Sequence, residues 1–224
     1  MPGKLIVIEG IDGSGKSTQF QLICEQLDAE GMQFERIIFP RYKESSSAML
    51  RMYLDGAFGD SPDDVNPYAA STFYAVDRFA SYRMDWREHY EGGGLVLTDR
   101  YTTANAVHQG AKLPKPQQPA FFDWLEEYEY HLLEVPAPDL VIYLNIDPQL
   151  ALDHIQKRQL ETGGNGDIHE RDAEFLRNCA ETGLHAAEYF GWDIVNCDLN
   201  GEVRDAKEIQ SDIMALIREV LETR

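Results

Sequence analysis

Five short runs of apolar residues recur along the chain, at 5–9 (LIVIE), 36–39 (RIIF), 95–98 (LVLT), 140–144 (LVIYL) and 193–196 (DIVN). They are rich in Val and Ile and do not alternate between apolar and polar positions. Strands that are buried on both faces of a parallel sheet need continuous apolar runs of this kind. The pattern therefore predicts five strands of a mostly parallel sheet.

Longer segments with apolar residues at three- and four-residue spacing separate these runs, which is typical of amphipathic helices. In the first of them Phe20, Ile23 and Leu27 share one face, and Gly31 follows as a C-cap. Strands that alternate with helices predict an α/β fold with three layers, in which helices flank a five-stranded parallel sheet. The predicted helices cover residues 17–30, 67–90, 119–134, 148–160, 170–190 and 202–221.

Two segments break the alternation. LPKPQQP at 113–119 is rich in proline and is interpreted as a surface connection. ETGGNGD at 161–167 is rich in Gly and Asn between two predicted helices, so we interpret it as a mobile loop.

Composition limits the possible classes of protein. The 224 residues are 43% hydrophobic and 26% charged, which suits one domain over residues 1–224. The net charge of −19 argues against binding to nucleic acid or to an anionic membrane surface, but it leaves room for a local pocket for a small anion. No window approaches the roughly 20 apolar residues of a membrane span. Three cysteines without metal-site spacing indicate a reducing compartment, and the first residues do not resemble a signal peptide, so we expect a cytoplasmic protein.

The clearest chemical motif lies between the first predicted strand and the first predicted helix. It reads G-x-x-x-x-G-K-[ST] and is typical of a phosphate loop, in which backbone N–H groups and the following helix start bind phosphate oxygens. The lysine is expected to reach the β- and γ-phosphates of a nucleoside triphosphate, and the serine hydroxyl to coordinate Mg²⁺. The predicted ATP-binding residues are Gly10, Ile11, Asp12, Gly13, Ser14, Gly15, Lys16, Ser17 and Thr18.

Further polar residues follow other predicted strands, at the sheet edge where open α/β proteins bind their ligands. Asp99 is a candidate to hold Mg²⁺ or to orient a substrate hydroxyl, and Arg100 is a candidate phosphate clamp. The alternative is a local Asp–Arg ion pair that shapes the turn. Arg41 lies just past another strand. Tyr74 and Arg78 are one helical turn apart and suit stacking on a base and reading its edge, although such a pair, taken alone, more often reflects packing and solvated charge.

Basic residues surround the Gly-rich loop. Lys157, Arg158 and Arg171 are interpreted as part of a lid over approximately 157–171, which closes over the transferred phosphoryl group and excludes water. The alternative interpretation is a solvated run of charges.

Together, these segments resemble the thymidylate kinase family. The resemblance is carried in family order by EGIDGSGKSTQ, FPR, FYAVDRF, DRY at 99–101, APDLVIYLNIDP at 137–148 and HERD at 169–172. It covers nearly the whole chain and implies a three-layer P-loop NTPase fold with a short lid. It also implies transfer of the γ-phosphoryl group of ATP to dTMP, with Mg²⁺ as cofactor and usually in a homodimer.

The resemblance also implies roles for single residues. Asp12 matches the carboxylate that contacts the sugar 3′-hydroxyl and helps to position the acceptor phosphate. Tyr74 stands where the family places a Phe that stacks on thymine. Arg78 matches the arginine that reads the thymine edge, and Arg100 the arginine that binds the acceptor phosphate. Asn105 and Gln109 are expected to face the base or sugar, and the segment 197–203 resembles the loop that passes over adenine.

The chain departs from the family pattern at three places. One branch of the family has an arginine where this chain has Gly13, so the catalytic arginine is expected from the lid, as Arg158 or Arg171. Arg41 follows Phe-Pro directly, one residue earlier than in some relatives, and Tyr74 adds a hydroxyl to the stacking ring. The predicted catalytic residues are Lys16, Asp12, Arg100, Arg158 and Arg171, and the predicted metal ligands are Ser17 and Asp99.

Two other functions fit the same motifs. One is a kinase for another deoxynucleoside monophosphate or for a deoxynucleoside, and the other is a switch that binds ATP and transfers nothing. The chain has no N-K-x-D sequence of the kind that reads guanine in GTPases. Asp12, Arg78 and Arg100 together favour an enzyme, since a switch has no use for an acceptor clamp.

Overall fold

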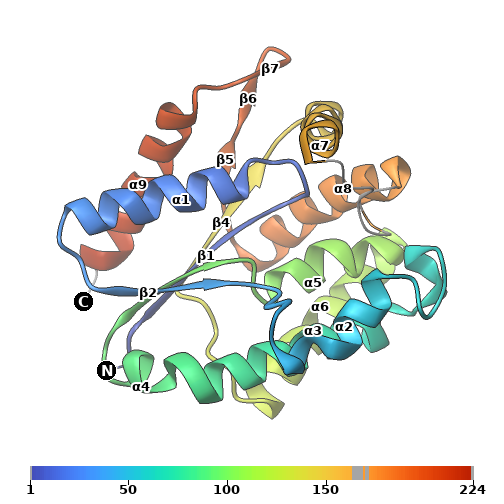
Figure 1. The fold of residues 1–224 in the computed structure, drawn as a ribbon, viewed down its shortest axis with the longest axis horizontal. Coiled ribbons are helices and arrows are strands. Elements are labelled where there is room, and N and C mark those ends of the chain that lie inside the picture. The colour runs from blue at the N-terminus through green and yellow to red at the C-terminus, as the bar shows by residue number, and fades with distance from the viewer. Residues whose placement is uncertain (1, 163–168, 170–171, 223–224) are drawn as a thin grey trace.

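A computed structural model describes residues 2–162, 169 and 172–222. Within them the five apolar runs form the strands of one sheet, which confirms the strand prediction (Figure 1). All neighbouring strands in the sheet are parallel, in the order β2-β3-β1-β4-β5. The strands are β1 (Lys4–Gly10), β2 (Phe34–Ile38), β3 (Leu95–Asp99), β4 (Leu140–Asn145) and β5 (Asp193–Asn196).

Both faces of the three central strands, β1, β3 and β4, are buried, as their continuous apolar runs predict, whereas the edge strands β2 and β5 are mostly exposed. Leu5 and Val7 of β1 pack in a cluster with Tyr82 and Trp86, whereas Ile6 and Ile8 pack in another cluster with residues of α1 and α9. Figure 1 shows α1 and α9 on one face and α3 to α6 on the other. The bounds of these helices are α1 (Lys16–Ala29), α3 (Pro67–Ser81), α4 (Arg87–Glu91), α5 (Thr103–His108), α6 (Gln118–Glu126) and α9 (Ala206–Glu222).

Three further helices complete the described fold: α2 (Ala48–Leu54), α7 (Pro148–Thr162) and α8 (Ala173–Phe190). Helix α2, which is short, was not predicted from the sequence. The predicted helix 170–190 begins later, because the Asp172 carboxylate accepts a hydrogen bond from the Phe175 N–H at 2.9 Å and caps α8. Gly191, at a φ of 71°, ends α8.

Two predicted helices contain π-helical turns. The segment 67–90 consists of α3, a π-helical turn over Tyr82–Trp86, and α4. The segment 119–134 consists of α6 followed by a π-helical turn over Glu127–Leu132. The predicted surface connection at 113–119 contains a 3₁₀ turn at Lys115–Gln117.

The last predicted helix, 202–221, was wrong at its start. Residues Glu202–Val203 form β7, which pairs antiparallel with β6 (Asp198–Leu199). Asn200 and Gly201 both have positive φ, at 54° and 81°, which is the conformation that a two-residue hairpin needs. The Asn-Gly dipeptide was the signal for this turn.

All three cysteines are buried and free of disulfides, as expected from their spacing. Among the described helices, none combines the length and the apolar character of a transmembrane segment.

The sheet topology determines where a ligand site can form. The carboxyl end of β1 lies between those of β3 and β4, with Ile8 opposite Asp99 and Gly10 opposite Leu144. The loop after β1 therefore adjoins the turn after β3. From β1 the chain continues to β2 and β3 on one side, and after β3 it crosses to β4 and β5 on the other side. Such a switch point in strand order is where open α/β sheets bind ligands.

Candidate active site

The loop between β1 and α1 presents backbone rather than side chains at the start of the helix. Gly10, Gly13 and Gly15 have φ of 155°, 79° and 88°, which favour glycine. Gly15 is the N-cap of α1, and no side chain caps the helix there. The first N–H groups of α1 are therefore available to an anion, which the helix dipole also favours.

Lys16 folds back over this loop. Its Nζ donates hydrogen bonds to the carbonyl oxygens of Gly10 and Ile11 at 2.8 and 2.7 Å, and its side chain is buried. Burial, together with the positive charge of Arg100, lowers the pKa of Lys16 to about 8. The ammonium group is thus mostly charged at neutral pH and lies inside the loop that would surround phosphates.

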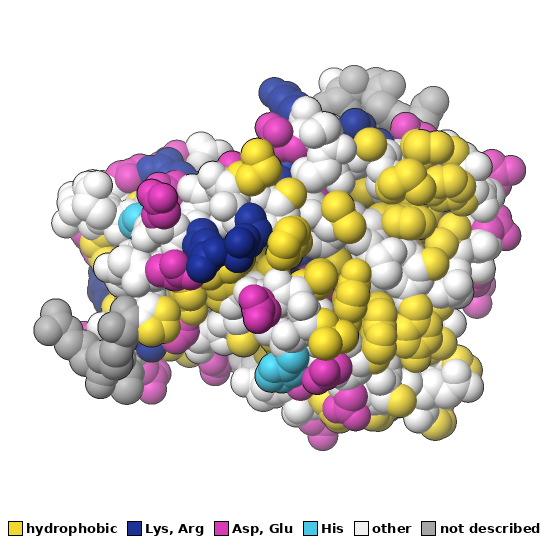
Figure 2. Space-filling view, turned by 90° about the horizontal axis from the view of Figure 1, so that it is seen from below, with side chains coloured by type: hydrophobic (Ala, Val, Ile, Leu, Met, Phe, Trp, Pro, Cys, Tyr) yellow, Lys and Arg dark blue, Asp and Glu magenta, His cyan; other side chains and the backbone are white. Residues whose placement is uncertain are grey.

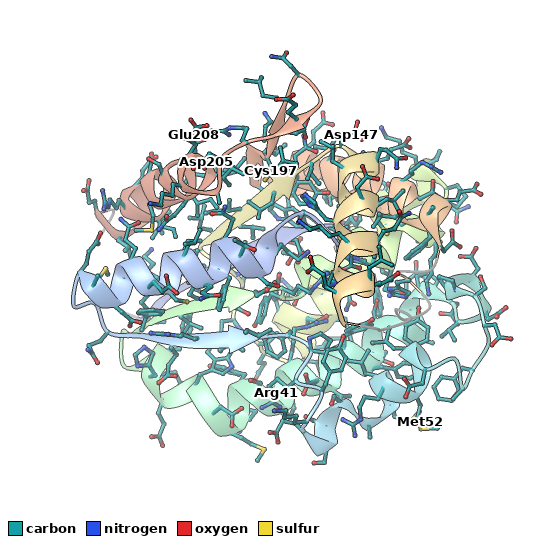
Figure 3. The ribbon with its side chains drawn as sticks, turned by 45° about the horizontal axis from the view of Figure 1, so that its top comes forward. Arg41, Met52, Asp147, Cys197, Asp205 and Glu208 are labelled. Atoms are coloured by element: carbon teal, nitrogen blue, oxygen red, sulfur yellow. The ribbon has the colours of Figure 1, made fainter. Side chains whose placement is uncertain are left out.

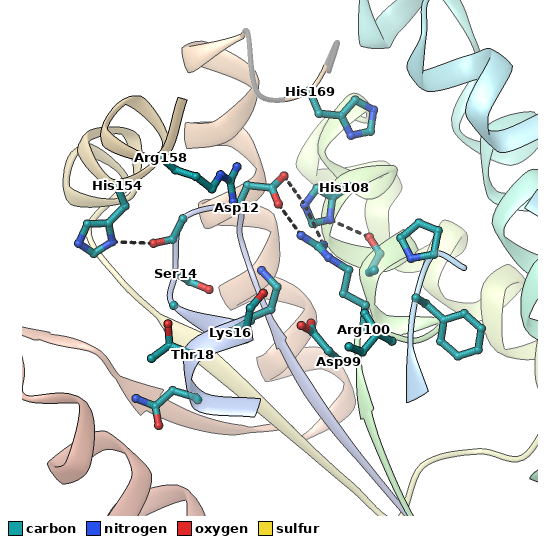
Figure 4. Close-up of a pocket in the computed structure, with 18 of the residues that line it drawn as sticks. Asp12, Ser14, Lys16, Thr18, Asp99, Arg100, His108, His154, Arg158 and His169 are labelled. Atoms are coloured by element: carbon teal, nitrogen blue, oxygen red, sulfur yellow. Dashed lines mark hydrogen bonds and ion pairs between the residues drawn. The ribbon is translucent and has the colours of Figure 1, made fainter. Parts of the chain in front are cut away.

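Asp12 and Arg100 form an ion pair across the cavity (Figure 4). Arg100 Nη2 donates to Asp12 Oδ1 at 2.5 Å, and Arg100 Nη1 lies 3.8 Å from the buried carboxylate of Glu9. His108 Nε2 lies 3.7 Å from Asp12 Oδ2. Burial alone would raise the pKa of Asp12, but Arg100 and His108 outweigh burial and hold that pKa well below its usual range. Asp12 is therefore a carboxylate at neutral pH.

Asp99, the last residue of β3, is nearly enclosed. Its Oδ1 is buried and has no hydrogen-bond partner among the described residues. Burial raises the pKa of Asp99, and Lys16 and Arg100 oppose that shift. A buried carboxylate oxygen without a partner fits a cation or a cation-bound water.

The described residues contain no group of three or more His, Cys, Asp or Glu side chains that could hold a metal by themselves. A single carboxylate suits Mg²⁺, which proteins usually bind through one or two carboxylates together with substrate phosphates and water.

These groups line a cavity of about 760 Å³, a size typical of sites for small molecules. The cavity brings together most of the predicted site residues, from the loop, from β3 and from α3, α5 and α7. Those on its wall are Asp12, Gly13, Ser14, Gly15, Lys16, Ser17, Thr18, Tyr74, Arg78, Asp99, Arg100, Asn105, Gln109 and Arg158. Cys197, just before β6, and Val203, the last residue of β7, also line the cavity.

Arg78 lines the cavity but is not a free cation. It is buried and forms a two-pronged ion pair with Glu129, with Nε and Nη2 at 2.6 and 2.5 Å from the two carboxylate oxygens. Gln109 also lines the cavity, and neither polar atom of its buried amide has a partner in the part of the chain that the structure describes. An amide in this state is suited to a polar ligand.

Arg41 is directed elsewhere. Its Nε donates to the buried carboxylate of Asp77 at 3.2 Å, its Nη2 donates to Ser46 Oγ at 3.1 Å, and its Nη1 pairs with Asp85. Figure 3 shows it beside the segment that precedes α2. It is not among the described residues that line the cavity, so the structure does not bring this predicted phosphate clamp to the site.

Helix α7 approaches the phosphate loop from the other side. His154 Nδ1 is 2.9 Å from the carbonyl oxygen of Gly13, and Lys157 and Arg158 follow on the cavity wall (Figure 4). Arg158 lies in the last part of α7, at the start of the predicted lid over approximately 157–171. Arg171 and most of the predicted mobile loop lie outside the described residues.

Four residues that shape this site, Glu9, His108, His154 and Glu129, were not predicted from the sequence. Glu9 interrupts the first apolar run, and this single buried charge was a usable signal. His108 follows Ala104 by one turn of α5, and its Nδ1 is 3.0 Å from that carbonyl oxygen. It stacks on His169 with ring centroids 6.1 Å apart. His154 lies one turn before Arg158, whereas Glu129 lies in an acidic stretch that carries no signal.

Gly13 offers a direct test of how tightly the loop and α7 pack. A Cβ at Gly13 would lie 2.3 Å from the carbonyl oxygen of Ala151, so Gly13→Ala forces α7 to move. We expect it to lower the free energy of unfolding by more than the about 1–2 kcal/mol of a left-handed residue alone. Gly31→Ala is the matched control, because Gly31 has a similar φ of +73° and nothing within 4 Å. Urea unfolding of both variants measures the difference, and equal losses would contradict the packing described here.

A five-stranded parallel sheet whose phosphate loop shares one cavity with Asp99 and Arg100 at the end of β3 is the arrangement of a P-loop phosphotransferase. A family model described as thymidylate kinase matches residues 8–209. The chain belongs to the thymidylate kinase family.

Known proteins resemble the chain over most of its length. It is 32% identical to the thymidylate kinase of Mycobacterium tuberculosis over 201 residues, which cover 88% of this chain and 92% of that one. It is 28% identical to the thymidylate kinase of Arabidopsis thaliana, across 98% of this chain and 74% of that one. The solved structure of the Candida albicans thymidylate kinase shares the fold, with a TM-score of 0.69 at 21% identity, over 97% of this chain and 92% of that chain.

Proposed function

We propose that this protein transfers the γ-phosphoryl group of Mg²⁺-ATP to dTMP and so produces dTDP. Family membership supports the reaction, and the observation that carries it is the Asp12–Arg100 pair, which faces Lys16 within one cavity. The pair joins the phosphate loop, to which Asp12 belongs, to the turn after β3, and Tyr74 and Arg78 line the same cavity. A donor and an acceptor nucleotide can therefore bind with their phosphates between Lys16 and Arg100.

On the donor side, backbone N–H groups at the start of α1 and the Lys16 ammonium bind the ATP phosphates. Ser17 and Asp99 would hold Mg²⁺, which would supply positive charge to the phosphate groups of ATP. Residues Cys197 and Val203 at the β6–β7 hairpin border the adenine subsite.

On the acceptor side, Arg100 binds the dTMP phosphate and Asp12 orients the sugar. Tyr74 stacks on the base, and Arg78, Asn105 and Gln109 face its polar edge. Because the acceptor is already a phosphate oxygen, the reaction needs alignment and charge stabilisation rather than a strong general base. An arginine at position 13 would collide with α7, because a Cβ there lies 2.3 Å from the Ala151 carbonyl oxygen. We therefore assign the positive charge at the transferred group to Arg158 of α7 and to Arg171.

We also propose that the protein is a cytoplasmic homodimer whose chain forms one domain. The proposed interface is the outer face of α3, where Val76, Phe79 and Tyr68 are exposed and Tyr68 packs edge-on against Trp124 of α6. Figure 2 shows hydrophobic side chains gathered on the side where these helices lie. A second copy of the same face suits such a surface. Sedimentation velocity tests this, since a single monomeric species at micromolar concentration would exclude the dimer.

Steady-state ADP release tests the acceptor. ATP-Mg²⁺ is supplied with dTMP, dUMP, dCMP, dGMP, AMP or thymidine, one at a time. The proposed function predicts turnover with dTMP well above turnover with dCMP, dGMP and AMP. Highest turnover with another monophosphate would keep the phosphotransferase and reject the assigned base. ATP binding without acceptor-dependent ADP release would favour a nucleotide switch.

A further inference from the structure

Glu129 is a completely buried carboxylate behind the acceptor subsite. It lies in the π-helical turn Glu127–Leu132, in which the backbone N–H of Leu133 bonds to the carbonyl oxygen of Tyr128. The wider turn directs Glu129 into the core, whereas Glu127 remains exposed. π-Helical turns within helices are frequent at functional sites.

Four side-chain hydrogen bonds converge on Glu129 from three parts of the chain. Arg78 of α3 donates from Nε at 2.6 Å and from Nη2 at 2.5 Å. Thr102, just before α5, donates from Oγ1 at 2.9 Å, and Asn105 within α5 donates from Nδ2 at 3.2 Å. The two oxygens of Glu129 therefore hold the two polar residues, Arg78 and Asn105, that line the acceptor side of the cavity.

The pairing leaves part of Arg78 for a ligand. A guanidinium group has five N–H donors, of which Glu129 takes two and the Tyr101 carbonyl takes one from Nη1 at 3.3 Å. A two-pronged ion pair fixes the plane of the guanidinium group, so the remaining N–H donors point in a fixed direction. Glu129 itself is not among the described residues that line the cavity.

We propose that Glu129 is a positioning residue that sets the choice of acceptor base, because it holds the donors of Arg78 and Asn105 in one orientation. This rests on the proposed function, in which dTMP is the acceptor. Fixed N–H donors favour the O4 acceptor of thymine and oppose the amino group that cytosine carries at the same place. If the N–H donors of Arg78 and Asn105 were mobile, they could turn away from the cytosine amino group, and the enzyme would then discriminate less between thymine and cytosine.

The two parts of base recognition can be separated experimentally. Thymine and cytosine differ at the edge that Arg78 faces, whereas thymine and uracil differ only by a methyl group, which is recognised through pocket shape. Loss of the carboxylate should therefore change the first preference and leave the second unchanged. A purely structural role would lower the active fraction and reduce turnover of all three acceptors in the same proportion.

The test compares kcat/KM for dTMP, dCMP and dUMP in Glu129→Gln at saturating ATP. We expect the ratio of dTMP to dCMP to fall by about tenfold or more. The ratio of dTMP to dUMP and the KM for ATP should stay within about threefold of wild type. Glu127→Gln is the matched control, because it removes the same charge from the same turn at an exposed position, and it should leave all ratios unchanged.

Glu129→Asp guards against a variant that fails to fold. It keeps a negative charge beside Arg78 but shortens the side chain, so we expect a smaller loss of the dTMP to dCMP ratio than in Glu129→Gln. If a folded Glu129 variant keeps this ratio within twofold of wild type, Glu129 does not have the proposed role. Absence of dTMP turnover in the wild-type protein would instead overturn the proposed function, so the two failures are distinguishable.

Discussion

Lys16→Ala is expected to lower kcat by about a hundredfold to a thousandfold, the range seen when one group that stabilises transition-state charge is removed. The physical reason is that the Lys16 ammonium lies buried inside the phosphate loop and has no nearby cation on the same loop to replace it. In phosphoryl transfer the charge on the transferred oxygens must be neutralised, and little covalent chemistry is left for other groups. Single-turnover transfer from ATP to dTMP measures the effect.

The control for Lys16→Ala is Lys4→Ala, at the opposite end of β1. Lys4 is partly exposed and pairs with Asp139 at 3.0 Å, so its removal should leave kcat within about twofold and have little effect on stability. Circular dichroism should show both variants folded. A folded Lys16→Ala protein with activity within about tenfold of wild type would reject the role assigned to Lys16.

Arg100→Met is expected to reduce kcat/KM for dTMP by about a hundredfold, mainly through KM. Charge-assisted hydrogen bonds contribute about 1.5–3 kcal/mol, and each 1.4 kcal/mol corresponds to a factor of ten. Arg100 also holds Asp12 at 2.5 Å, so its loss leaves Asp12 without its main counter-charge. Methionine keeps the length of the side chain without its charge. Initial rates at varied dTMP measure the change.

Arg100→Lys and Arg87→Met complete this experiment. The lysine keeps the charge and loses the planar fork, so it should recover only part of the activity. Arg87 is exposed and pairs with Glu91 on the next turn, at 2.7 Å, and its loss should leave KM for dTMP unchanged. If Arg100→Met also leaves that KM unchanged, Arg100 does not bind the acceptor phosphate.

Local sequence patterns predicted most of the fold because they follow directly from burial. Continuous apolar runs require two buried faces, and β1 does send Leu5 and Ile6 to opposite clusters. The phosphate loop was predictable for a similar reason, since its glycines and the following helix are contiguous in sequence. The parallel sheet then brings the turn after β3 beside this loop, so the position of Asp99 and Arg100 next to the loop was also predictable.

Side-chain direction was not predictable where it depends on a distant partner. Arg41 follows a strand end as expected, but Asp77, 36 residues away in sequence, turns it from the cavity. Glu129 is buried because Arg78, 51 residues earlier, neutralises it and because a π-helical turn reorients it. Neither partner is visible in a local pattern. The late start of α9 could have been predicted, because Asn200-Gly201 is a typical hairpin turn. The helical spacing of apolar residues from Val203 onward led us to start the helix too early.

In the proposed reaction the phosphoryl group moves directly from ATP to dTMP. Incubation of the protein with ATP labelled with ³²P at the γ-position, Mg²⁺ and dTMP tests it, with the products separated by thin-layer chromatography. Direct transfer predicts that the label appears in dTDP, in amounts equal to the ADP formed. Label that appears as inorganic phosphate, or that remains in ATP while dTMP is present, would contradict it.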